Sequence, residues 1–356
     1  MTGRKTIRIR VPQVEPGMVL GNDVFSGAGT VLLTKATLLT DYTIAQLRAW
    51  QIEYVDVKDA KNEKNPAREG GRNYAREDAA FANMYAHSLD SIAELFEEMH
   101  HSDKVPVQEF LPIAEGILDQ VLGVQGVLRR LHQVKTGDEY TFSHSLNVGI
   151  YAVLIGSWLN YGAEDLRMLA TAGLLHDAGK VKVPAAIIKK AGPLSADEYQ
   201  EIQRHPFYGY QLVANTPGMP KKIALAVLQH HEREDGTGYP LKLSSPTILS
   251  IAKIIAVADV FDAVTSNRCY QARRPPHVAA SIIMEESFKS LDPVVAQSFL
   301  ARIVPYLFND DIRLNNGMTG RIIQLNRLSP TRPLVQTEQG FIDLNQMPEL
   351  KIVDVV

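Results

Sequence analysis

The placement of histidine and aspartate within strongly apolar segments constrains this fold more than any other feature of the sequence. Segment 254–260 is apolar except for Asp259, and His176-Asp177 and His230-His231 each end an apolar helical run. A buried carboxylate is stable only when a cation, a network of donors or a metal ion balances it. The chain must therefore fold so that these groups, carried on buried helices, satisfy one another.

Five histidines and two aspartates form this polar set, and their residue types predict a metal site. One histidine on a helix is more often a hydrogen-bonded structural residue than a ligand, so the prediction depends on the whole set. Imidazole and carboxylate without thiolate argue against a structural zinc site and suit iron or manganese. The predicted ligands are His144, His176, Asp177, His205, His230, His231 and Asp259.

Asp177 is the residue that could link two metal ions. If its two oxygens bridge two divalent ions, each ion has four protein bonds, and a six-coordinate ion keeps about two open positions. Two ions about 4 Å apart can activate water and stabilise the entering and leaving oxygens at phosphorus. The sequence therefore predicts hydrolysis of a phosphodiester bond, with Asp177 as both metal ligand and catalytic group.

The hydrophobic pattern predicts a mainly α protein with five parts. Residues 1–57 combine short β-like runs with one short helical stretch, which predicts a small mixed α/β unit. Residues 58–77 are rich in charged residues and glycine and predict a flexible linker. Residues 78–135 predict connecting helices, which could pack on the core or on a second copy of the chain. Residues 136–309 predict an all-helical catalytic domain, and residues 310–356 a small β unit.

Glycine residues mark the loops of the same region. Gly179 follows the run that ends in His176-Asp177 and predicts a helix end. Gly236 and Gly238 allow backbone angles closed to other residues and allow a ligand to approach the main chain closely. Pro240 restricts the exit of this loop. By itself the loop is an ordinary turn, but its attachment to two predicted ligands makes it a candidate rim of the site.

Composition limits the partners and the compartment. The formal net charge of -3 argues against non-specific binding to a DNA or RNA duplex, although a local basic pocket for one phosphate ligand is allowed. No stretch of 18 uninterrupted apolar residues is present and the N-terminus has no apolar core, which predicts neither a membrane span nor a signal peptide. The single cysteine, Cys269, excludes an intramolecular disulfide and predicts a reducing compartment, by default the cytoplasm.

Taken together, these motifs resemble the HD-GYP family, a subgroup of the HD phosphohydrolases that cleaves the bacterial second messenger cyclic di-GMP. The resemblance covers about residues 144–270. It implies an all-helical HD-type bundle as catalytic core and a metal centre usually reported with iron or manganese. The matching motifs are LHDAGK at 175–180, Pro184, GPL at 192–194, His205 with Gly209, HHEREDGTGYP at 230–240 and ADVFDAVTS at 258–266.

The resemblance also implies individual roles. Lys180 would contact the scissile phosphate and help to protonate or neutralise the leaving oxygen. Gly238 and Tyr239 would line the substrate cleft, and Arg268 would meet a phosphate or a guanine. Asp262 is a further candidate for substrate contact, with an ordinary hydrogen bond inside the bundle as the equal alternative. For the metals, His144, His176, Asp177 and Asp259 would hold one ion, and Asp177, His205, His230 and His231 the other.

Three positions depart from the family pattern. Members with a third metal carry a glutamate where this chain has Tyr140, so we expect two ions. Where the family has a proline after the substrate-binding arginine, this chain has Cys269. Where the family has a lysine or arginine next to its tyrosine, this chain has Gln271. A pocket that lacks this charge-assisted hydrogen bond could lose about one to two decades of affinity, so Gln271 either weakens binding or indicates a different cyclic dinucleotide.

The expected function is a cytoplasmic phosphodiesterase that converts cyclic di-GMP to linear pGpG or GMP. One alternative is a catalytically weak cyclic dinucleotide receptor that recruits a protein partner through the loop around Tyr239; another is a hydrolase of a different cyclic dinucleotide. The intact ligand set favours an enzyme, whereas Gln271 and Tyr140 favour the receptor. The N-terminal segment resembles small units that precede HD-GYP domains, which implies regulation or docking, and the connecting helices leave a homodimer open.

Overall fold

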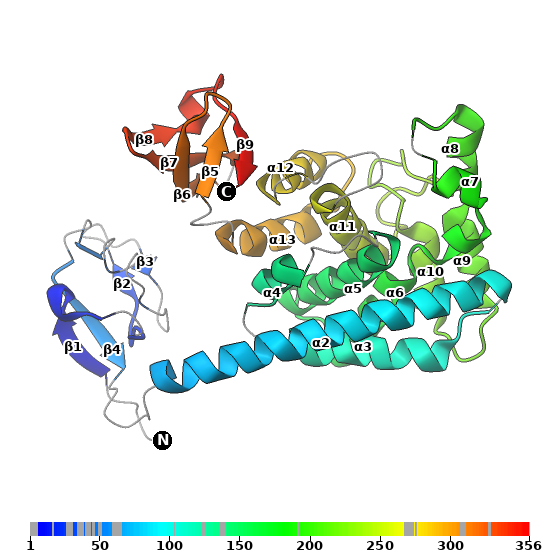
Figure 1. The fold of residues 1–356 in the computed structure, drawn as a ribbon, viewed down its shortest axis with the longest axis horizontal. Coiled ribbons are helices and arrows are strands. Elements are labelled where there is room, and N and C mark those ends of the chain that lie inside the picture. The colour runs from blue at the N-terminus through cyan, green and yellow to red at the C-terminus, as the bar shows by residue number, and fades with distance from the viewer. Residues whose placement is uncertain are drawn as a thin grey trace. The chain divides into compact units, whose positions relative to one another are not determined.

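The structure is a computed structural model that divides into two compact units, Met1–Ala79 and Ala80–Val356 (Figure 1). Each unit is described by itself. The described residues are 6–15, 18–25, 31–33, 39, 44, 47–48, 52–58, 66–102, 104–122, 126–134, 140–190, 192–266, 274, 276–306, 311–326 and 329–355.

The described residues of the first unit form two small antiparallel sheets with their own core. β1 (Thr6–Arg10) leads into the short η1 (Val11–Gln13) and pairs with β4 (Tyr54–Lys58). β2 (Val24–Phe25) pairs with β3 (Val31–Leu33). The helical part of the predicted α/β unit falls largely outside the described residues. The core of this unit consists of Val11, Val14, Leu20, Val24, Leu39, Ile44, Leu47, Val55 and Val57.

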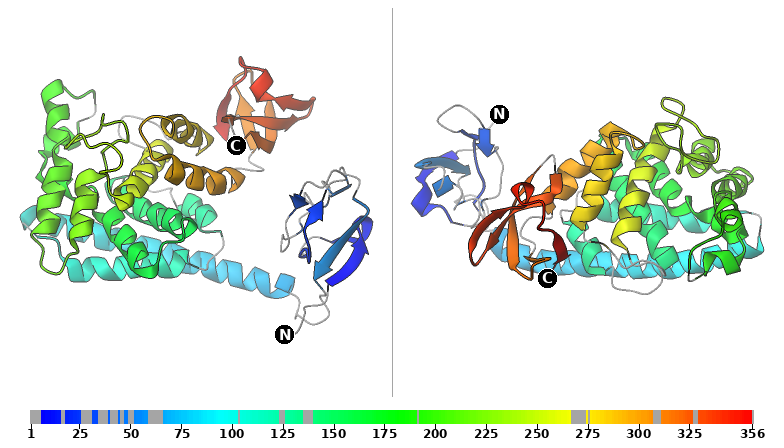
Figure 2. Two further views of the ribbon diagram at one scale, coloured as in Figure 1. Left: turned by 180° about the vertical axis from the view of Figure 1, so that it is seen from behind. Right: turned by 90° about the horizontal axis from the view of Figure 1, so that it is seen from above.

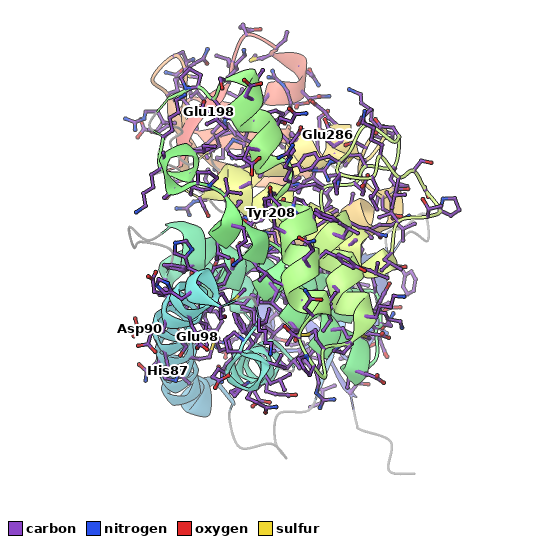
Figure 3. The ribbon with its side chains drawn as sticks, turned by 90° about the vertical axis from the view of Figure 1, so that its right-hand side faces the viewer. His87, Asp90, Glu98, Glu198, Tyr208 and Glu286 are labelled. Carbon is purple, nitrogen blue, oxygen red and sulfur yellow. The ribbon has the colours of Figure 1, made fainter. Side chains whose placement is uncertain are left out.

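Helix α2 (Pro66–His101) corrects the predicted linker at 58–77. From Pro66 onward the backbone is helical, because each residue added to an existing helix gains a hydrogen bond, and alanine, arginine and glutamate are good helix formers. Residues 59–65 of that predicted linker lie outside the described residues. Further along, α2 is the first of the connecting helices predicted at 78–135, and it is amphipathic, since Phe81, Tyr85 and Ile92 are buried. Figure 3 shows His87, Asp90 and Glu98 on the outer face of the same helix.

The rest of the predicted connecting segment contains α3 (Val107–Val121) and α4 (Val127–Val134). α3 packs beside α2, as Figures 1 and 2 show, and the rings of Phe96 and Phe110 meet edge to face with centroids 6.4 Å apart. In the part of the chain that the structure describes, no helix is long and apolar enough to cross a membrane.

The rest of the second unit is a helical bundle, which confirms the mainly α fold class. α5 (Tyr140–Trp158) is buried on nearly all sides, as expected for a helix that is apolar all round. α8 (Ala196–Ile202) begins with a capping box, in which Ser195 and Glu198 satisfy each other's amides. The other helices are α6 (Ala163–Leu175), η3 (Ala178–Lys182), α7 (Ala185–Ile188), α8 (Ala196–Ile202), α9 (His205–Ala214), α10 (Lys221–Gln229), α11 (Ser250–Thr265), α12 (Pro276–Glu286) and α13 (Pro293–Tyr306).

Two glycine contacts set the spacing of the helices in this bundle. A Cβ added at Gly173 in α6 would lie 2.6 Å from the Cα of Gly149 in α5, so these two helices touch backbone to backbone. A Cβ added at Gly179 would lie 1.9 Å from the carbonyl oxygen of His205 and 2.3 Å from the amide nitrogen of Gly209. Gly179 is therefore not the predicted helix end: α6 already ends at Leu175, and glycine is required because η3 lies directly on α9.

The C-terminal part is an antiparallel sheet with the strand order β8-β7-β6-β5-β9. β7 contacts α12, and Ile312, Ile322 and Val335 belong to the same hydrophobic core as the helices. The predicted small β unit is confirmed, although the predicted domain boundaries stay predictions. The elements are β5 (Asp311–Leu314), β6 (Thr319–Asn326), β7 (Ser329–Thr337), β8 (Gly340–Asp343), η4 (Leu344–Gln346) and β9 (Ile352–Val355).

Candidate metal centre

The structure brings all the predicted metal ligands together in two adjacent groups. Within each group, one ligand atom from every residue lies within 4.8 Å of the others. The division into groups agrees with the one that the family resemblance implies. One group is His144, His176 and Asp259, and the other is Asp177, His205, His230 and His231.

The ligands come from elements that are far apart in the sequence. His144 lies near the start of α5 and Asp259 in the interior of α11, whereas His205 is the first residue of α9. His176 and His230 cap the C-terminal ends of α6 and α10. The close backbone contact of α5 with α6 places His144 beside His176, and the contact of η3 with α9 places Asp177 beside His205.

Three of the histidines have their orientation set by the helix that precedes them. The last carbonyl oxygens of a helix have no donor within the helix, so an imidazole N–H can satisfy one of them. With the proton on Nδ1, the lone pair of Nε2 is free to bind a metal. The contacts are His176 Nδ1 to Gly173 O at 2.7 Å, His205 Nδ1 to Ile202 O at 2.6 Å and His230 Nδ1 to Val227 O at 2.6 Å.

The Nε2 atoms of these histidines converge on points that suit a cation. The Nε2 atoms of His205 and His230 are 3.3 Å apart, and so are those of His144 and His176. Among the described residues, no hydrogen-bond donor satisfies the buried Asp177 Oδ1, which lies 3.2 Å from His205 Nε2. Asp177 Oδ2 lies 3.5 Å from His176 Nε2. The two oxygens of Asp177 thus face different groups, which fits a carboxylate shared between two ions.

Burial and neighbouring charges set the protonation of this cluster. Burial, reinforced by neighbouring imidazoles, holds the pKa of His230 and His231 well below the ordinary value. Burial alone would raise the pKa of Asp177, but Lys180 and nearby imidazoles lower it well below the ordinary value. Burial alone would lower the pKa of His144, yet hydrogen bonds with two aspartates raise it to about 9. Neutral imidazoles and ionised carboxylates are the forms that bind metals, so His230, His231 and Asp177 are already in these forms, whereas His144 has to lose a proton before it binds an ion.

Asp262 is enclosed in the bundle and orients His144. Its side chain is 0% exposed, and its Oδ2 lies 2.8 Å from His144 Nδ1 and accepts a hydrogen bond from Ser266 Oγ at 3.1 Å. The implied substrate contact of Asp262 stays a prediction, although the carboxylate is enclosed in the bundle. The alternative, a hydrogen bond inside the bundle, is confirmed. The sequence gives an indication of this role, because Asp262 is three residues after the predicted ligand Asp259 and therefore shares its face of α11.

Two further residues of this network are missed by sequence reasoning. Asn147 Nδ2 donates to Asp262 Oδ1 at 2.9 Å, and Tyr85 OH donates to Asn147 Oδ1 at 2.9 Å. Asn147 could have been found, because it is a polar residue within the apolar α5, three residues after His144. Tyr85 carries no such signal, since its position in α2 also fits ordinary core packing.

Lys180 lies where the metal groups meet solvent. Its Nζ is 2.5 Å from Asp177 Oδ2, and its side chain is 31% exposed. An ammonium group in this place has donors left for a ligand that approaches from the open side. The residue is in reach of the predicted site, and its role at the phosphate stays a prediction.

The glycine-containing loop forms a wall beside His231. Gly236 has the expected left-handed backbone, with φ of 77°. Gly238 is required for another reason than expected: a Cβ there would lie 2.5 Å from the amide nitrogen of Arg233, so it is the loop's own main chain that approaches closely. The Tyr239 ring lies 4.6 Å from the ring of His231 between centroids. Burial, with nearby Asp259, raises the pKa of Tyr239, so its phenol stays protonated.

Glu232 holds this loop in place and is also missed by sequence reasoning. Its buried carboxylate accepts hydrogen bonds from the amides of Leu241, at 2.6 Å, and Leu243, at 2.8 Å. The exit of the loop is thereby tied to the residue that follows His231. Predictions for Arg268, Cys269 and Gln271 fall outside the described residues, and so does the side chain of Tyr140.

Comparison with known proteins adds to this geometry. Residues 135–295 match the family model of the HD domain. The chain is 31% identical over 247 residues to cyclic di-GMP phosphodiesterase PA4108 of Pseudomonas aeruginosa, covering 69% of this chain and 59% of that protein. It is 34% identical over 188 residues to 3'3'-cGAMP-specific phosphodiesterase 3 of Vibrio cholerae, covering 53% of this chain and 40% of that protein. The chain thus spans about half the length of these curated relatives.

A solved structure has a similar fold. It is Bd1817, an HDG"Y"P protein from Bdellovibrio bacteriovorus, with a TM-score of 0.51 and 15% sequence identity. The superposition covers 84% of this chain and 99% of that chain. At this identity the likeness concerns the fold alone.

Proposed function

Because the chain is a member of the HD-GYP family, we propose that it is a metal-dependent phosphodiesterase that hydrolyses cyclic di-GMP to linear pGpG or GMP. The observation that carries this proposal is the convergence of buried imidazoles on both oxygens of Asp177. A retired site would have no reason to keep such a costly arrangement, because buried charges destabilise a fold unless they are balanced.

The proposal assigns two divalent ions, iron or manganese, to the two groups. His144, His176 and Asp259 would hold one ion, and His205, His230 and His231 the other, with Asp177 shared. Bound ions of this kind supply Lewis acidity to phosphate oxygens and lower the pKa of water. The absence of thiolate in the ligand set supports iron or manganese over a structural zinc.

Other residues of the chain would bind and orient the substrate. Lys180 would meet the scissile phosphate and give a proton or positive charge to the leaving oxygen, which its position at the open side of the cluster supports. Tyr239, as a protonated phenol, and Gly238 would line the cleft. Arg268 would bind a phosphate or a guanine, and Gln271 would provide a neutral contact where the family pattern has a lysine or arginine.

Two observations keep other substrates and roles in view. A relative is named as specific for 3'3'-cGAMP, and Gln271 removes one positive charge from the phosphate region, so a different cyclic dinucleotide is the second candidate. The same position and Tyr140 favour the third candidate, a receptor that recruits a partner protein through the loop 230–240. The proposal further includes a cytoplasmic location, supported by the single cysteine, and leaves a homodimer through the connecting helices open.

The deciding experiment combines metal analysis with product analysis. The full chain is purified without oxygen, its bound metal is quantified, and it is incubated with cyclic di-GMP, 3'3'-cGAMP and cyclic di-AMP. Turnover of cyclic di-GMP by the metal-loaded chain is the expected result. Turnover that excludes cyclic di-GMP would support the second candidate, and binding without turnover would support the receptor. A metal-loaded chain that neither binds nor hydrolyses any of the three would contradict all these functions.

A further inference from the structure

A line of buried hydrogen bonds connects α2 with a residue of the metal centre. Tyr85 OH donates to Asn147 Oδ1 at 2.9 Å, and Asn147 Nδ2 donates to Asp262 Oδ1 at 2.9 Å. The other oxygen of Asp262 lies 2.8 Å from Nδ1 of His144. All four side chains are at most 4% exposed, so solvent does not compete for these contacts.

Each contact in this line determines the orientation of the next group. The Asn147 amide has a carbonyl and an NH₂ side, and the Tyr85 hydroxyl holds the carbonyl toward α2. The NH₂ side then faces the Asp262 carboxylate; rotation of the amide would bring two oxygens together and leave buried groups unpaired. The carboxylate in turn accepts the Nδ1 proton of His144, which leaves Nε2 directed at the metal group.

We infer that Tyr85 and Asn147, acting through Asp262, are positioning residues for His144, so that α2 helps to set the metal affinity of the group that contains this histidine. The inference rests on the metal centre of the proposed function. Tyr85 lies outside residues 135–295, which match the HD domain. A helix that precedes that domain in the sequence therefore contributes to its metal site.

The test measures Mn²⁺ binding directly. The full chain is stripped of metal, and Mn²⁺ affinity is determined by competition with a chelating indicator for the wild type, Tyr85→Phe, Asp262→Asn and the double variant. Loss of an outer-shell partner typically weakens metal binding about 10- to 100-fold, which we expect for Asp262→Asn. For Tyr85→Phe, which removes one neutral hydrogen bond, we expect about threefold to tenfold. Only the binding step that involves His144 should change.

Two features separate positioning from a general structural effect. Ser88→Ala is the matched control, because it deletes another buried hydroxyl of α2 and leaves the hydrogen-bond line intact; its Mn²⁺ affinity should equal that of the wild type. The double variant should bind Mn²⁺ as Asp262→Asn does, since Tyr85 acts through Asp262 and the two effects are not additive. If Asp262→Asn does not fold, Asn147→Ser takes its place in the same comparison.

Wild-type Mn²⁺ affinity in Tyr85→Phe would overturn the inference. Strict additivity of the two substitutions would do the same, as would equal weakening in Ser88→Ala. A wild-type chain that binds Mn²⁺ but hydrolyses no cyclic dinucleotide would contradict the proposed function only, since the metal-binding comparison does not depend on turnover.

Discussion

The metal centre and the C-terminal sheet hold charged side chains in opposite ways. In the metal centre, Asp177 and Asp259 are buried and face imidazoles. In the sheet, Asp311 and Arg321 form an ion pair at 2.8 Å, with side chains 53% and 55% exposed. Water screens an exposed pair so that it contributes little, whereas a buried charge has to be matched by a ligand or a donor. Burial, and not the number of charges, distinguishes the functional region.

The largest effect is expected from Asp177→Ala. This substitution removes the carboxylate that faces both metal groups and leaves the opposing imidazoles without it. We expect metal and activity to be lost together, with activity reduced by more than the roughly 100-fold typical of outer-shell partners. Metal analysis and a cyclic di-GMP hydrolysis assay on the same preparation measure both. Full metal content in the variant would show that the buried carboxylate is structural and would remove the contrast with the sheet.

The next effect is expected from Lys180→Met, which keeps the metal ligands. Because a positioned proton donor contributes about 100-fold or more, we expect kcat to fall by at least about 100-fold while bound metal stays near the wild-type level. Lys182→Met, an exposed lysine of the same η3 segment, is the matched control and should retain activity. An equal fall in both variants would indicate a general charge effect near the site and not a role specific to Lys180.

A smaller effect is expected for a buried histidine outside the metal groups. Burial lowers the pKa of His277 in α12 to about 4. Its unfolded value is near 6.5, so the stability that depends on neutral His277 is present above pH 6.5 and is lost as the pH falls toward 4. From these values we expect a loss of about 2 kcal/mol at pH 5 relative to pH 7.

Denaturant unfolding at pH 5 and pH 7 measures how much stability the protein loses between these pH values. His277→Gln should lose less stability between the two pH values than the wild type does, and His87→Gln, on the outer face of α2, should behave like the wild type. Identical pH dependence in the wild type and His277→Gln would mean that burial of this ring does not disfavour its charged form.

The smallest effect is expected at the exposed pair of the sheet. Arg321 lowers the pKa of Asp311 through a hydrogen bond, but both groups are in contact with water. Arg321→Gln should therefore shift the thermal midpoint by about 2 °C or less. A thermal scan of the metal-loaded chain is sufficient. A large shift would show that this surface pair matters as much as the buried groups, which would break the comparison.

Much of the site could be predicted from the sequence because its ligands are polar residues within or at the ends of apolar segments. Asp259 within an apolar helix, and His176 and His230 at the ends of apolar runs, need partners wherever the chain folds. The mainly α bundle and the small C-terminal sheet follow equally from hydrophobic periodicity. Periodicity does not predict a helix at 66–77, because that segment lacks the apolar pattern and becomes helical as an extension of α2.

By itself, the sequence determined which side chains had to meet in this protein: the imidazoles and carboxylates that apolar helices cannot bury singly. Only the tertiary structure decided which ring nitrogens face the metal groups, that Asp262 is hydrogen-bonded to His144, and that Tyr85 reaches the same network. The structure alone also showed that Gly179 allows η3 to lie on α9 and that Glu232 holds the loop after His231. The physical reason is that orientation depends on contacts between helices remote in the chain, and no local pattern records the neighbour across such a contact.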